Sequence, residues 1–229
     1  MKSSIIVFPG SNCDRDVAVA IKNVTNTTAQ MLWHKETSIK NTDLIILPGG
    51  FSHGDYLRSG SIASRAPIMK EVIKCANNGI PVVGICNGFQ ILTECGLLPG
   101  VLMRNKNMNF ICKYVNLISK NKNLWVKDNE INKVISYPVA HHDGNYFVNK
   151  DDLEILVKNN RIIFQYCSND GKIDEKANIN GSVNNIAGIT NDNGNVLGMM
   201  PHPERAIDNR LGGSDGINFF ENILNVIGT

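Results

Sequence analysis

Residues 82–92, VVGICNGFQIL, place a cysteine between two glycines at the end of an apolar run. The run before Cys86 is typical of a buried β-strand, and the residues after it are typical of the start of a helix. The pentapeptide from Gly84 to Gly88 has the form G-x-C-x-G, the thiol counterpart of the G-x-S-x-G nucleophile elbow. Small residues on either side of the nucleophile allow a tight turn above the carboxyl edge of a parallel sheet. The stretch therefore predicts an α/β fold and a reactive thiol.

A second interpretation of Cys86 stays open at this point. Cysteine is among the residues most often buried in cores, where it is usually inert. At an elbow, by contrast, the amino terminus of the following helix favours the thiolate, and the amide of Asn87 can donate to an oxyanion. The pentapeptide does not decide between a core thiol and a nucleophile, so a second oxyanion donor and a base are needed.

The first half of the chain alternates short apolar runs with amphipathic stretches. Strand–helix alternation of this kind predicts a parallel sheet covered by helices on both faces. The expected fold is therefore α/β, with a flavodoxin-like, open and mostly parallel sheet. Strands are expected at 3–8, 43–50 and 80–86, and helices at 14–24, 66–79 and 87–95.

After Pro99 the pattern changes. Longer apolar segments ending in Asn, Gly or Asp predict an additional antiparallel strand region, at 110–119, 134–148 and 162–169. Two Asn- and Lys-rich segments, 119–133 and 169–185, are expected to be polar loops, and a last helix is expected over 215–228. No repeat or linker interrupts the chain, which predicts one domain over residues 1–229.

The composition excludes several classes of protein. Apolar residues make up 42% and charged residues 19%, the net charge is +2, and no block of like charge indicates a nucleic-acid or membrane partner. The six cysteines form no C-x-x-C pair, so neither a disulfide framework nor a zinc-type spacing is indicated. No apolar stretch is long enough for a signal peptide or a membrane span. We therefore expect a cytoplasmic, metal-free protein.

The segment PGGFSHGDYLR, residues 48–58, ends the neighbouring predicted strand. The carboxyl ends of adjacent parallel strands line one crevice, so this turn is expected beside the elbow. Its two glycines, Gly49 and Gly50, allow backbone amides to approach a bound carbonyl. A plain turn is the alternative interpretation, and the position beside the elbow favours an oxyanion donor.

One of the five histidines has the surroundings of a catalytic base. His34 follows a short strand and is expected at the surface, while His141 and His142 are adjacent on a strand and face opposite sides. His202 lies in the segment PHPER, where two prolines favour an extended backbone. In an extended segment the side chains of His202 and Glu204 project to the same side, so the carboxylate can orient the imidazole. The pattern therefore predicts a Cys-His-Glu arrangement.

These segments together resemble the class I, triad-type, glutamine amidotransferases. The resemblance rests on GICNGFQIL, PGGFSHGDYLR and PHPER, the last followed by GGSDGINFFENIL. Three further segments, PGSNCDRD, RNKNMNFICKYV and PVAHHDGNY, narrow it to the glutaminase subunits of phosphoribosylformylglycinamidine synthases, from purine biosynthesis. The similarity extends over nearly the whole chain, and the motifs occur in the order found in that family.

The resemblance implies a role for each motif residue. It implies hydrolysis of the glutamine side-chain amide through a γ-glutamyl thioester. The other five cysteines are then expected to be dispensable for the chemistry. The implied roles are catalytic for Cys86, His202 and Glu204, oxyanion hole for the amides of Gly50 and Asn87, and glutamine binding for Gln90, Asn105 and Phe110.

The implied fate of the ammonia points to partner subunits. The chain has no G-x-x-x-x-G-K-[ST] phosphate loop, so ATP and Mg²⁺ are expected to be used by another polypeptide, with no cofactor in this chain. The family implies a large synthetase subunit, which converts formylglycinamide ribonucleotide to formylglycinamidine ribonucleotide, and a small accessory subunit. The turn residues His53, Asp55, Tyr56 and Arg58 are expected to be exposed and to dock on the synthetase.

The sequence departs from the family pattern at three positions, His53, Asn109 and His142, which concern the docking surface and pocket rim rather than the triad. Three alternatives stay open. One is a cysteine hydrolase or stress protein of the related protease-like superfamily, which usually takes its acid from near the amino terminus. Another is a relative that keeps the fold without catalysis. The third is a triad-type amidotransferase of another pathway.

Overall fold

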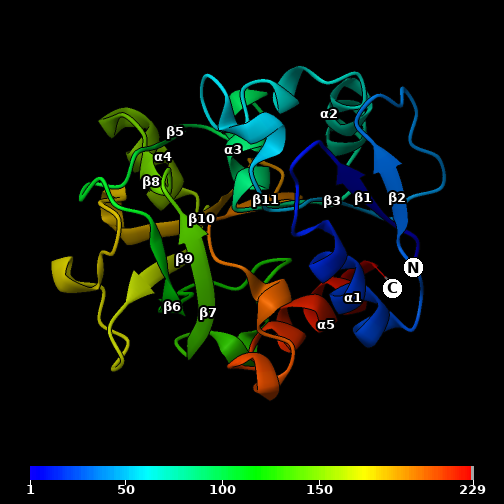
Figure 1. Ribbon diagram of the computed structural model, residues 1–229. Helices are drawn as coiled ribbons and strands as arrows, with labels where there is room; N and C mark the ends of the chain where they lie inside the picture. The colour runs from blue at the N-terminus through cyan, green and yellow to red at the C-terminus, as the bar shows by residue number, and fades with distance from the viewer. Residues whose placement is uncertain (228–229) are drawn as a thin grey trace.

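A nine-stranded sheet crosses the molecule in the computed structural model, which describes residues 1–227 (Figure 1). Five neighbouring strands are parallel, in the order β2 (Gln30–Trp33), β1 (Ser3–Val7), β3 (Leu44–Leu47), β4 (Val82–Ile85) and β11 (Val196–Met199). The sheet continues with antiparallel pairing through β10 (Ile186–Thr190), β9 (Ile162–Cys167), β6 (Ile111–Ile118) and β7 (Val134–His141). The predicted α/β fold, with a parallel sheet and an additional antiparallel strand region, is confirmed. That residues 1–229 form one domain stays a prediction.

Helices cover both faces of the parallel strands. Helices α1 (Asp14–Thr25) and α5 (Gly216–Ile227) pack together on one face, and α2 (Met69–Asn77) and α3 (Asn87–Glu94) lie on the other (Figure 1). Strands β3, β4 and β11 are buried along their whole length, which explains why their sequences are continuous apolar runs. The predicted last helix includes residue 228, which lies outside the described residues. None of the helices in the described part of the chain is long and apolar enough to cross a membrane.

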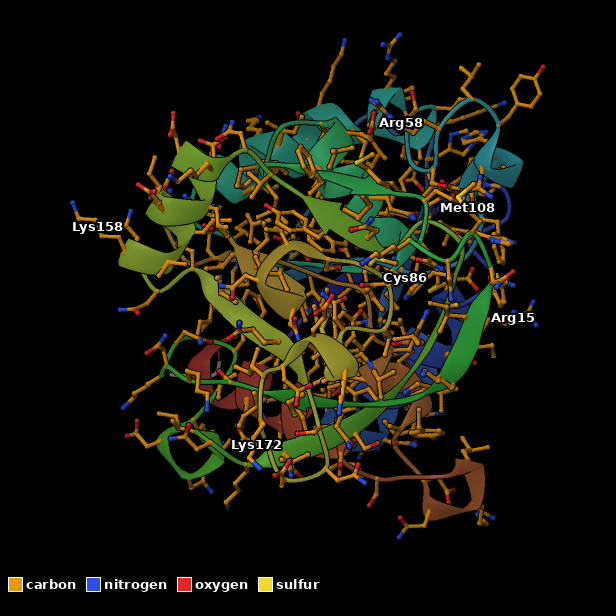
Figure 2. All side chains as sticks on the ribbon, turned by 90° about the vertical axis from the view of Figure 1, so that its left-hand side faces the viewer. Arg15, Arg58, Cys86, Met108, Lys158 and Lys172 are labelled. Carbon is orange, nitrogen blue, oxygen red and sulfur yellow. The ribbon has the colours of Figure 1, made fainter. Side chains whose placement is uncertain are left out.

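The second half of the chain differs from the expected pattern in two elements. The segment 134–148 forms two strands, β7 and β8 (Asn145–Phe147), and β8 pairs with β5 (Val101–Met103) in a separate two-stranded sheet. Helix α4 (Lys150–Lys158) is absent from the sequence prediction. It begins where the side chain of Asn149 accepts a hydrogen bond of 2.8 Å from an amide of the first turn. In Figure 2 this helix, marked by Lys158, lies on the opposite side of the view from Arg58 and Met108.

The two segments expected to be polar loops are loops, but parts of them are buried. Trp125 is 1% exposed, and its ring N–H donates to the carbonyl of Gly194 at 3.0 Å. Asn180 and Ser182 are also buried, and both donate to the carbonyl of Gly144. The second loop therefore braces the turn after β7, a use for its asparagines that composition alone does not show.

His34 is buried, so the prediction of a surface position is wrong. Its ring packs edge-on against His53, with centroids 5.2 Å apart, and against Trp33 at 4.6 Å. The turn after β3 covers the end of β2, and this long-range packing is not visible in the residues around His34.

Candidate active site

Four parallel strands, β1, β3, β4 and β11, end at the same edge of the sheet, and the chain segments that follow them meet there. The amide of Cys13, after β1, donates to the carbonyl of Gly49, after β3, at 3.2 Å. The amide of Cys86, after β4, donates to the carbonyl of Met199, the last residue of β11, at 2.7 Å. Sheet order therefore gathers residues from four distant parts of the sequence around Cys86.

Cys86 forms the predicted elbow between β4 and α3. Its φ of 50° and ψ of −106° lie outside the regions that L-residues favour, a conformation that costs about 1–3 kcal/mol and is concentrated at functional sites. A Cβ at Gly84 would lie 2.6 Å from the backbone of Gly88, and a Cβ at Gly88 would collide with the carbonyl oxygen of Leu47. Both glycines are therefore required by close packing, as the motif predicts.

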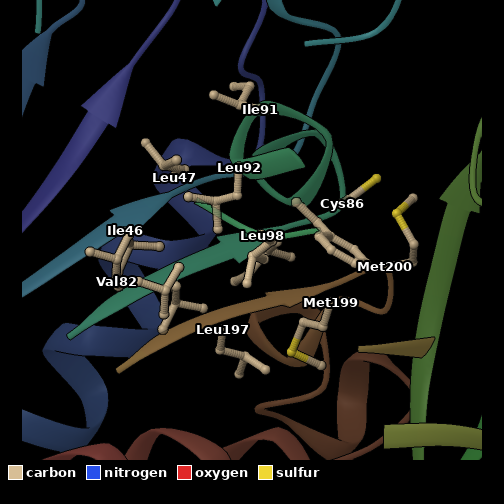
Figure 3. Close-up of a cluster of buried hydrophobic side chains, with 14 of the residues drawn as sticks. Ile46, Leu47, Val82, Cys86, Ile91, Leu92, Leu98, Leu197, Met199 and Met200 are labelled. Carbon is tan, nitrogen blue, oxygen red and sulfur yellow. The ribbon is translucent and has the colours of Figure 1, made fainter. Parts of the chain in front are cut away.

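The thiol of Cys86 lies at the boundary of the core. Figure 3 shows Leu197 and Val82 on the strands, Leu92 on α3, and the Cys86 sulfur beyond this apolar cluster at the end of β4. The residue is 4% exposed, and its Sγ lies 3.8 Å from the carbonyl oxygen of Ala140 on β7. Cys86 is therefore buried as a core thiol is, yet it stands in an elbow and borders a pocket.

His202 and Glu204 form a buried pair. His202 Nδ1 lies 2.6 Å from Glu204 Oε1, and the amide of His202 donates to the carbonyl of Pro138, which fixes the ring beside β7. The backbone is not extended through the pair as expected, because residues Pro203–Arg205 form a 3₁₀ turn. The turn still directs both side chains to one site.

The charge state of His202 is set by competing effects. Burial alone lowers the pKa of an imidazole, but the carboxylate of Glu204 and the thiolate of Cys86 outweigh it and hold the pKa of His202 well above its usual range. Nε2 of His202 has no hydrogen-bond partner among the described residues. The imidazole can therefore carry a proton on the side of the thiol and deliver it there.

The two residues predicted to donate to an oxyanion lie beside Cys86: Gly50 lines the same small pocket, and Asn87 follows Cys86 in the chain. Gly50 has a φ of +135°, and a Cβ at this position would lie 2.6 Å from the carbonyl oxygen of Gly10, so only glycine fits. Asn87 is the first residue of α3, whose amide has no carbonyl one turn earlier in the helix. The side chain of Asn87 accepts a hydrogen bond of 3.2 Å from the Ser52 amide, which ties the turn after β3 to the elbow.

A small pocket opens beside Cys86. The side chain of Gln90 is fixed at this pocket, because its Nε2 donates to the carbonyl of Asp143 at 2.7 Å and its Oε1 accepts from Asn87 at 2.8 Å. A larger open pocket adjoins the small one and shares Phe51, Asp55, His142 and Asp143 with it. The small pocket is lined by Gly50, Phe51, Asp55, Cys86, Gln90, Ala140, His141, His142 and Asp143.

The other two candidate glutamine-binding residues, Asn105 and Phe110, do not line the small pocket. The side chain of Asn105 is fully buried, donates to the carbonyls of Asn109 and His141, and accepts from the ring of His141 and the amide of Gly144. Its hydrogen-bonding capacity is therefore used inside the protein, where it holds the turn after β7 in place. Phe110 is 42% exposed and packs edge-on against His142, with ring centroids 5.0 Å apart. A glutamine-binding role for either residue stays a prediction.

Sequence reasoning gave two groups at this edge no place in the site: Cys13 was expected to be dispensable, and Asp55 was expected to be an exposed docking residue. Cys13 lies beside His202 and Glu204, with the ligand atoms of all three residues within 4.8 Å of one another. Asp55 lines the pocket, and burial, together with the charge of Asp143, raises the pKa of its carboxyl to about 6 against the opposing hydrogen bond from Ser59. The signal for both was their position in the segments that follow β1 and β3, because parallel strands end at one edge.

The buried ring of His141 predicts how the unfolding free energy of the chain depends on pH. Burial, assisted by the charge of His202, lowers its pKa to about 4, below the ordinary value of 6.5 that it has in the unfolded chain. The unfolded chain therefore binds more protons between these values, and stability is lost as the pH falls through this window. We expect this group to remove about 3 kcal/mol of unfolding free energy between pH 7 and pH 4.

Urea unfolding of the whole chain at several pH values measures this effect. His141→Gln is expected to unfold with a shallower dependence on pH, and His142→Gln, which changes the exposed neighbour, is the matched control. Equal pH slopes for the His141 variant and the unchanged chain would contradict the assignment.

Comparison with known proteins agrees with the geometry. Residues 1–212 match the model of the CobB/CobQ-like glutamine amidotransferase domain. The chain belongs to this glutamine amidotransferase family. Among the amidotransferase relatives, subunit PurQ of phosphoribosylformylglycinamidine synthase from Pelagibacter ubique is 51% identical over 226 residues, which cover 98% of this chain and 99% of that protein.

Other relatives of this amidotransferase chain are similar over their whole length. The PurQ subunit from Zymomonas mobilis is 50% identical over 229 residues, covering 99% of this chain and 100% of that protein. The solved structure of PurLQS from Thermotoga maritima contains a chain that is 40% identical, with a TM-score of 0.84 and coverage of 98% of this chain and 97% of that one. A glutamine amidotransferase from the same organism, 16% identical with a TM-score of 0.63 and coverage of 100% and 99%, shares the fold.

Proposed function

We propose that this chain is the glutaminase subunit of a phosphoribosylformylglycinamidine synthase and hydrolyses L-glutamine to glutamate and ammonia. One observation carries the proposal: the elbow thiol of Cys86 lies at the same sheet edge as His202, whose ring Glu204 holds at 2.6 Å. The full-length similarity to PurQ subunits supports the choice of this member over an amidotransferase of another pathway.

The geometry supports a two-step reaction. The thiolate of Cys86 attacks the amide carbon of glutamine, and the amides of Gly50 and Asn87 receive the negative charge that develops on the oxygen. His202 gives its proton to the departing nitrogen, which leaves as ammonia, and a γ-glutamyl thioester remains on Cys86. His202, now neutral, takes a proton from water, which attacks the thioester and releases glutamate.

Each part of the site then has a role in this proposal. Glu204 keeps the imidazole in one tautomer and stabilises its charged form. Gln90 lines the pocket, where it can hold the substrate. Asn105 acts behind the pocket, and Phe110 acts at the rim of the pocket beside His142. Loss of one oxyanion donor in such chemistry costs about 3 kcal/mol of transition-state stabilisation.

Ammonia must reach its acceptor without escaping into water. We infer that a separate ATP-dependent synthetase subunit uses it to convert formylglycinamide ribonucleotide to formylglycinamidine ribonucleotide, with a small accessory subunit in the same complex. The match to a chain of the solved PurLQS assembly supports this inference. ATP and Mg²⁺ belong to the synthetase, this chain needs no cofactor for glutamine hydrolysis, and the complex works in the cytoplasm.

The protease-like alternative is less well supported. Its members usually take the acidic partner of the histidine from near the amino terminus. Here Glu204, two residues after His202, supplies a carboxylate at 2.6 Å. A non-catalytic relative is also disfavoured. An unstrained turn would connect β4 to α3 equally well, so the strained backbone of Cys86 indicates a function for this residue.

A glutamine-mimicking electrophile, such as a diazo-ketone analogue, tests the proposal directly. We expect it to modify Cys86 alone, because Cys86 is the one cysteine among the residues that line the small pocket. Mass spectrometry of the labelled, digested chain identifies the site. Excess glutamine must protect Cys86, and labelling that spreads over several cysteines or is unaffected by glutamine would overturn the proposal.

The segment 48–58 is the expected point of control by the synthetase, with the turn Gly49–Gly54 as its mobile part. Its tip is exposed, with Tyr56 at 72% and Leu57 at 80%, but His53 and Asp55 are only partly exposed, which corrects the prediction that all the docking residues project freely. His53, Asp55 and Leu57 have positive φ, so the segment is strained. A change at Gly50 in this turn could withdraw one oxyanion donor without moving the sheet.

We therefore expect the isolated chain to hydrolyse glutamine slowly, and the synthetase loaded with nucleotide and acceptor to raise turnover about 10²–10³-fold, the effect of one donor. Glutamate release is measured for the chain alone and in the complex across glutamine concentrations. Equal turnover in the two conditions would exclude this control.

A further inference from the structure

A second thiol lies behind the catalytic histidine. Cys13 is 2% exposed, and its Sγ belongs with His202 and Glu204 to a buried group whose ligand atoms lie within 4.8 Å of one another. The reaction proposed above uses Cys86 on the Nε2 side of the ring and gives Cys13 no task. Arg205 Nη2 lies 3.1 Å from the Cys13 sulfur, and Arg205 is paired in turn with Asp16 at 3.0 Å.

The group has an unused ligand atom. Oε1 of Glu204 contacts the imidazole, but Oε2 is buried and has no hydrogen-bond partner among the described residues. Buried carboxylate oxygens without a partner are rare and call for an explanation such as an ion. Gly49 lies tightly against the group: a Cβ there would lie 2.7 Å from His202 Cε1 and 3.2 Å from Cys13 Sγ. A side chain at position 49 would therefore collide with the ring and crowd the sulfur, so glycine allows the two ligands to stand together under this turn.

The three ligand types match zinc. A thiolate, an imidazole and a carboxylate are the ligands that Zn²⁺ accepts, and a set of three protein ligands leaves one position for water. Tetrahedral zinc holds such atoms about 3.2–3.6 Å apart, so ligands already within 4.8 Å need only small movements. The charges also balance, because Zn²⁺ offsets the thiolate and Glu204, while Asp16 offsets Arg205.

Glu204 borders an open pocket that shares no lining residue with the pocket beside Cys86. Arg205, Asp16, Tyr114 and Pro138 also line it, and Asp16 is paired there with Arg205 at 3.0 Å. Cys13 and His202 do not line this pocket, so Glu204 is the ligand that an ion arriving from this side meets first.

We propose that Cys13, His202 and Glu204 form an inhibitory Zn²⁺ site that switches off the glutaminase. The ion takes the place of the proton on His202 Nδ1 and of the thiol proton of Cys13, and both protons are released to solvent. The Nδ1–H to Glu204 contact is lost, and the imidazole lone pair on Nδ1 is held by the metal. His202 can no longer be oriented and stabilised by Glu204, so proton transfer at Cys86 stops. The inhibitory effect rests on the proposed function, whereas the binding of the metal does not.

Metal binding is tested first in a chain that cannot catalyse. Cys86→Ala removes the alternative pair of Cys86 with His202, and Cys112→Ser removes the exposed thiol in every sample. Co²⁺ serves as the optical probe, since thiolate ligation gives a charge-transfer band and tetrahedral geometry gives strong visible absorption, and Zn²⁺ must displace it at one equivalent. We expect these bands in the Cys86→Ala, Cys112→Ser chain.

The cysteine variants decide the identity of the ligand. Adding Cys13→Ala or Cys13→Ser is expected to abolish the charge-transfer band and to weaken Zn²⁺ binding by more than about 10²-fold. Removing a group that only hydrogen-bonds to a metal ligand weakens binding by up to about 10²-fold, so a larger loss identifies Cys13 as a ligand. Adding Cys167→Ser, at a buried thiol on β9, is the matched control and must leave the bands in place. Circular dichroism checks that each chain is folded. No bands in the parent chain, or bands that survive the loss of Cys13, would overturn the site.

Inhibition is tested separately in the complex with intact Cys86. Each rate of glutamine hydrolysis is divided by the metal-free rate of the same variant, so a change in basal activity does not enter. We expect the Zn²⁺ concentration for half inhibition to rise at least tenfold in Cys13→Ser and to stay unchanged in Cys167→Ser. Equal inhibition of all variants would reject the switch. Metal binding without any glutaminase activity would reject the proposed function and leave the metal site standing.

Discussion

Cys86→Ala is expected to lower glutamine-dependent synthesis by a factor on the order of 10⁶, the loss seen when a covalent nucleophile is removed from a triad. The variant should fold, because alanine fits the space of the thiol and the elbow is set by Gly84 and Gly88 rather than by sulfur. Alanine at a φ of 50° adds no strain beyond that already borne by Cys86. The loss of activity therefore reports the missing nucleophile and not a misfolded chain.

Ammonia separates this outcome from a general failure of the complex. Synthesis by the Cys86→Ala complex is measured with glutamine and then with ammonium salt at high concentration. Ammonium is expected to restore synthesis, because the synthetase needs only the product of the missing reaction. Cys75→Ser, Cys95→Ser and Cys167→Ser are matched controls that change other thiols and must keep glutamine-dependent turnover. Full glutaminase turnover in Cys86→Ala would refute the triad.

Glu204→Gln is expected to lower the rate by up to about 10⁴, the effect of replacing the triad acid by its amide in related chemistry. The substitution preserves size and one hydrogen bond to His202 Nδ1, but it removes the negative charge that opposes the effect of burial. The pKa of His202 must therefore fall, since burial lowers it and Glu204 is the leading cause that raises it. The charged imidazole is then lost at a lower pH.

The sign of this change can be read from an NMR titration of the histidine rings. The His202 imidazole should lose its proton at a lower pH in Glu204→Gln than in the unchanged chain, because the carboxylate that raises its pKa is gone. Glu154→Gln is the matched control, because Glu154 is an exposed carboxylate on α4, away from the triad. An unchanged rate and an unchanged His202 titration in Glu204→Gln would remove Glu204 from the mechanism.

Local sequence determined the parts of the site that lie close together along the chain. The elbow at Cys86 was predictable because a strand, a tight turn and a helix follow one another without interruption, and the two glycines mark where the backbone crowds. The pairing of His202 with Glu204 was predictable for the same reason, although the prolines produce a 3₁₀ turn rather than an extended segment. A contact predicted between residues two to four positions apart stays correct even when the predicted backbone conformation is slightly wrong.

Sheet order and loop packing decided the rest. Cys13 meets His202 across 189 residues, and no pattern around either one shows it. Asn105 became an internal support of the turn after β7, and His34 was covered by the turn after β3, both through contacts between remote segments. A parallel sheet brings the ends of strands to one edge, but which strands are neighbours depends on burial of the whole core. Local propensity fixes the turn that carries a catalytic side chain, whereas its neighbours are fixed only when the sheet closes, because long-range contacts form from the summed burial of many residues.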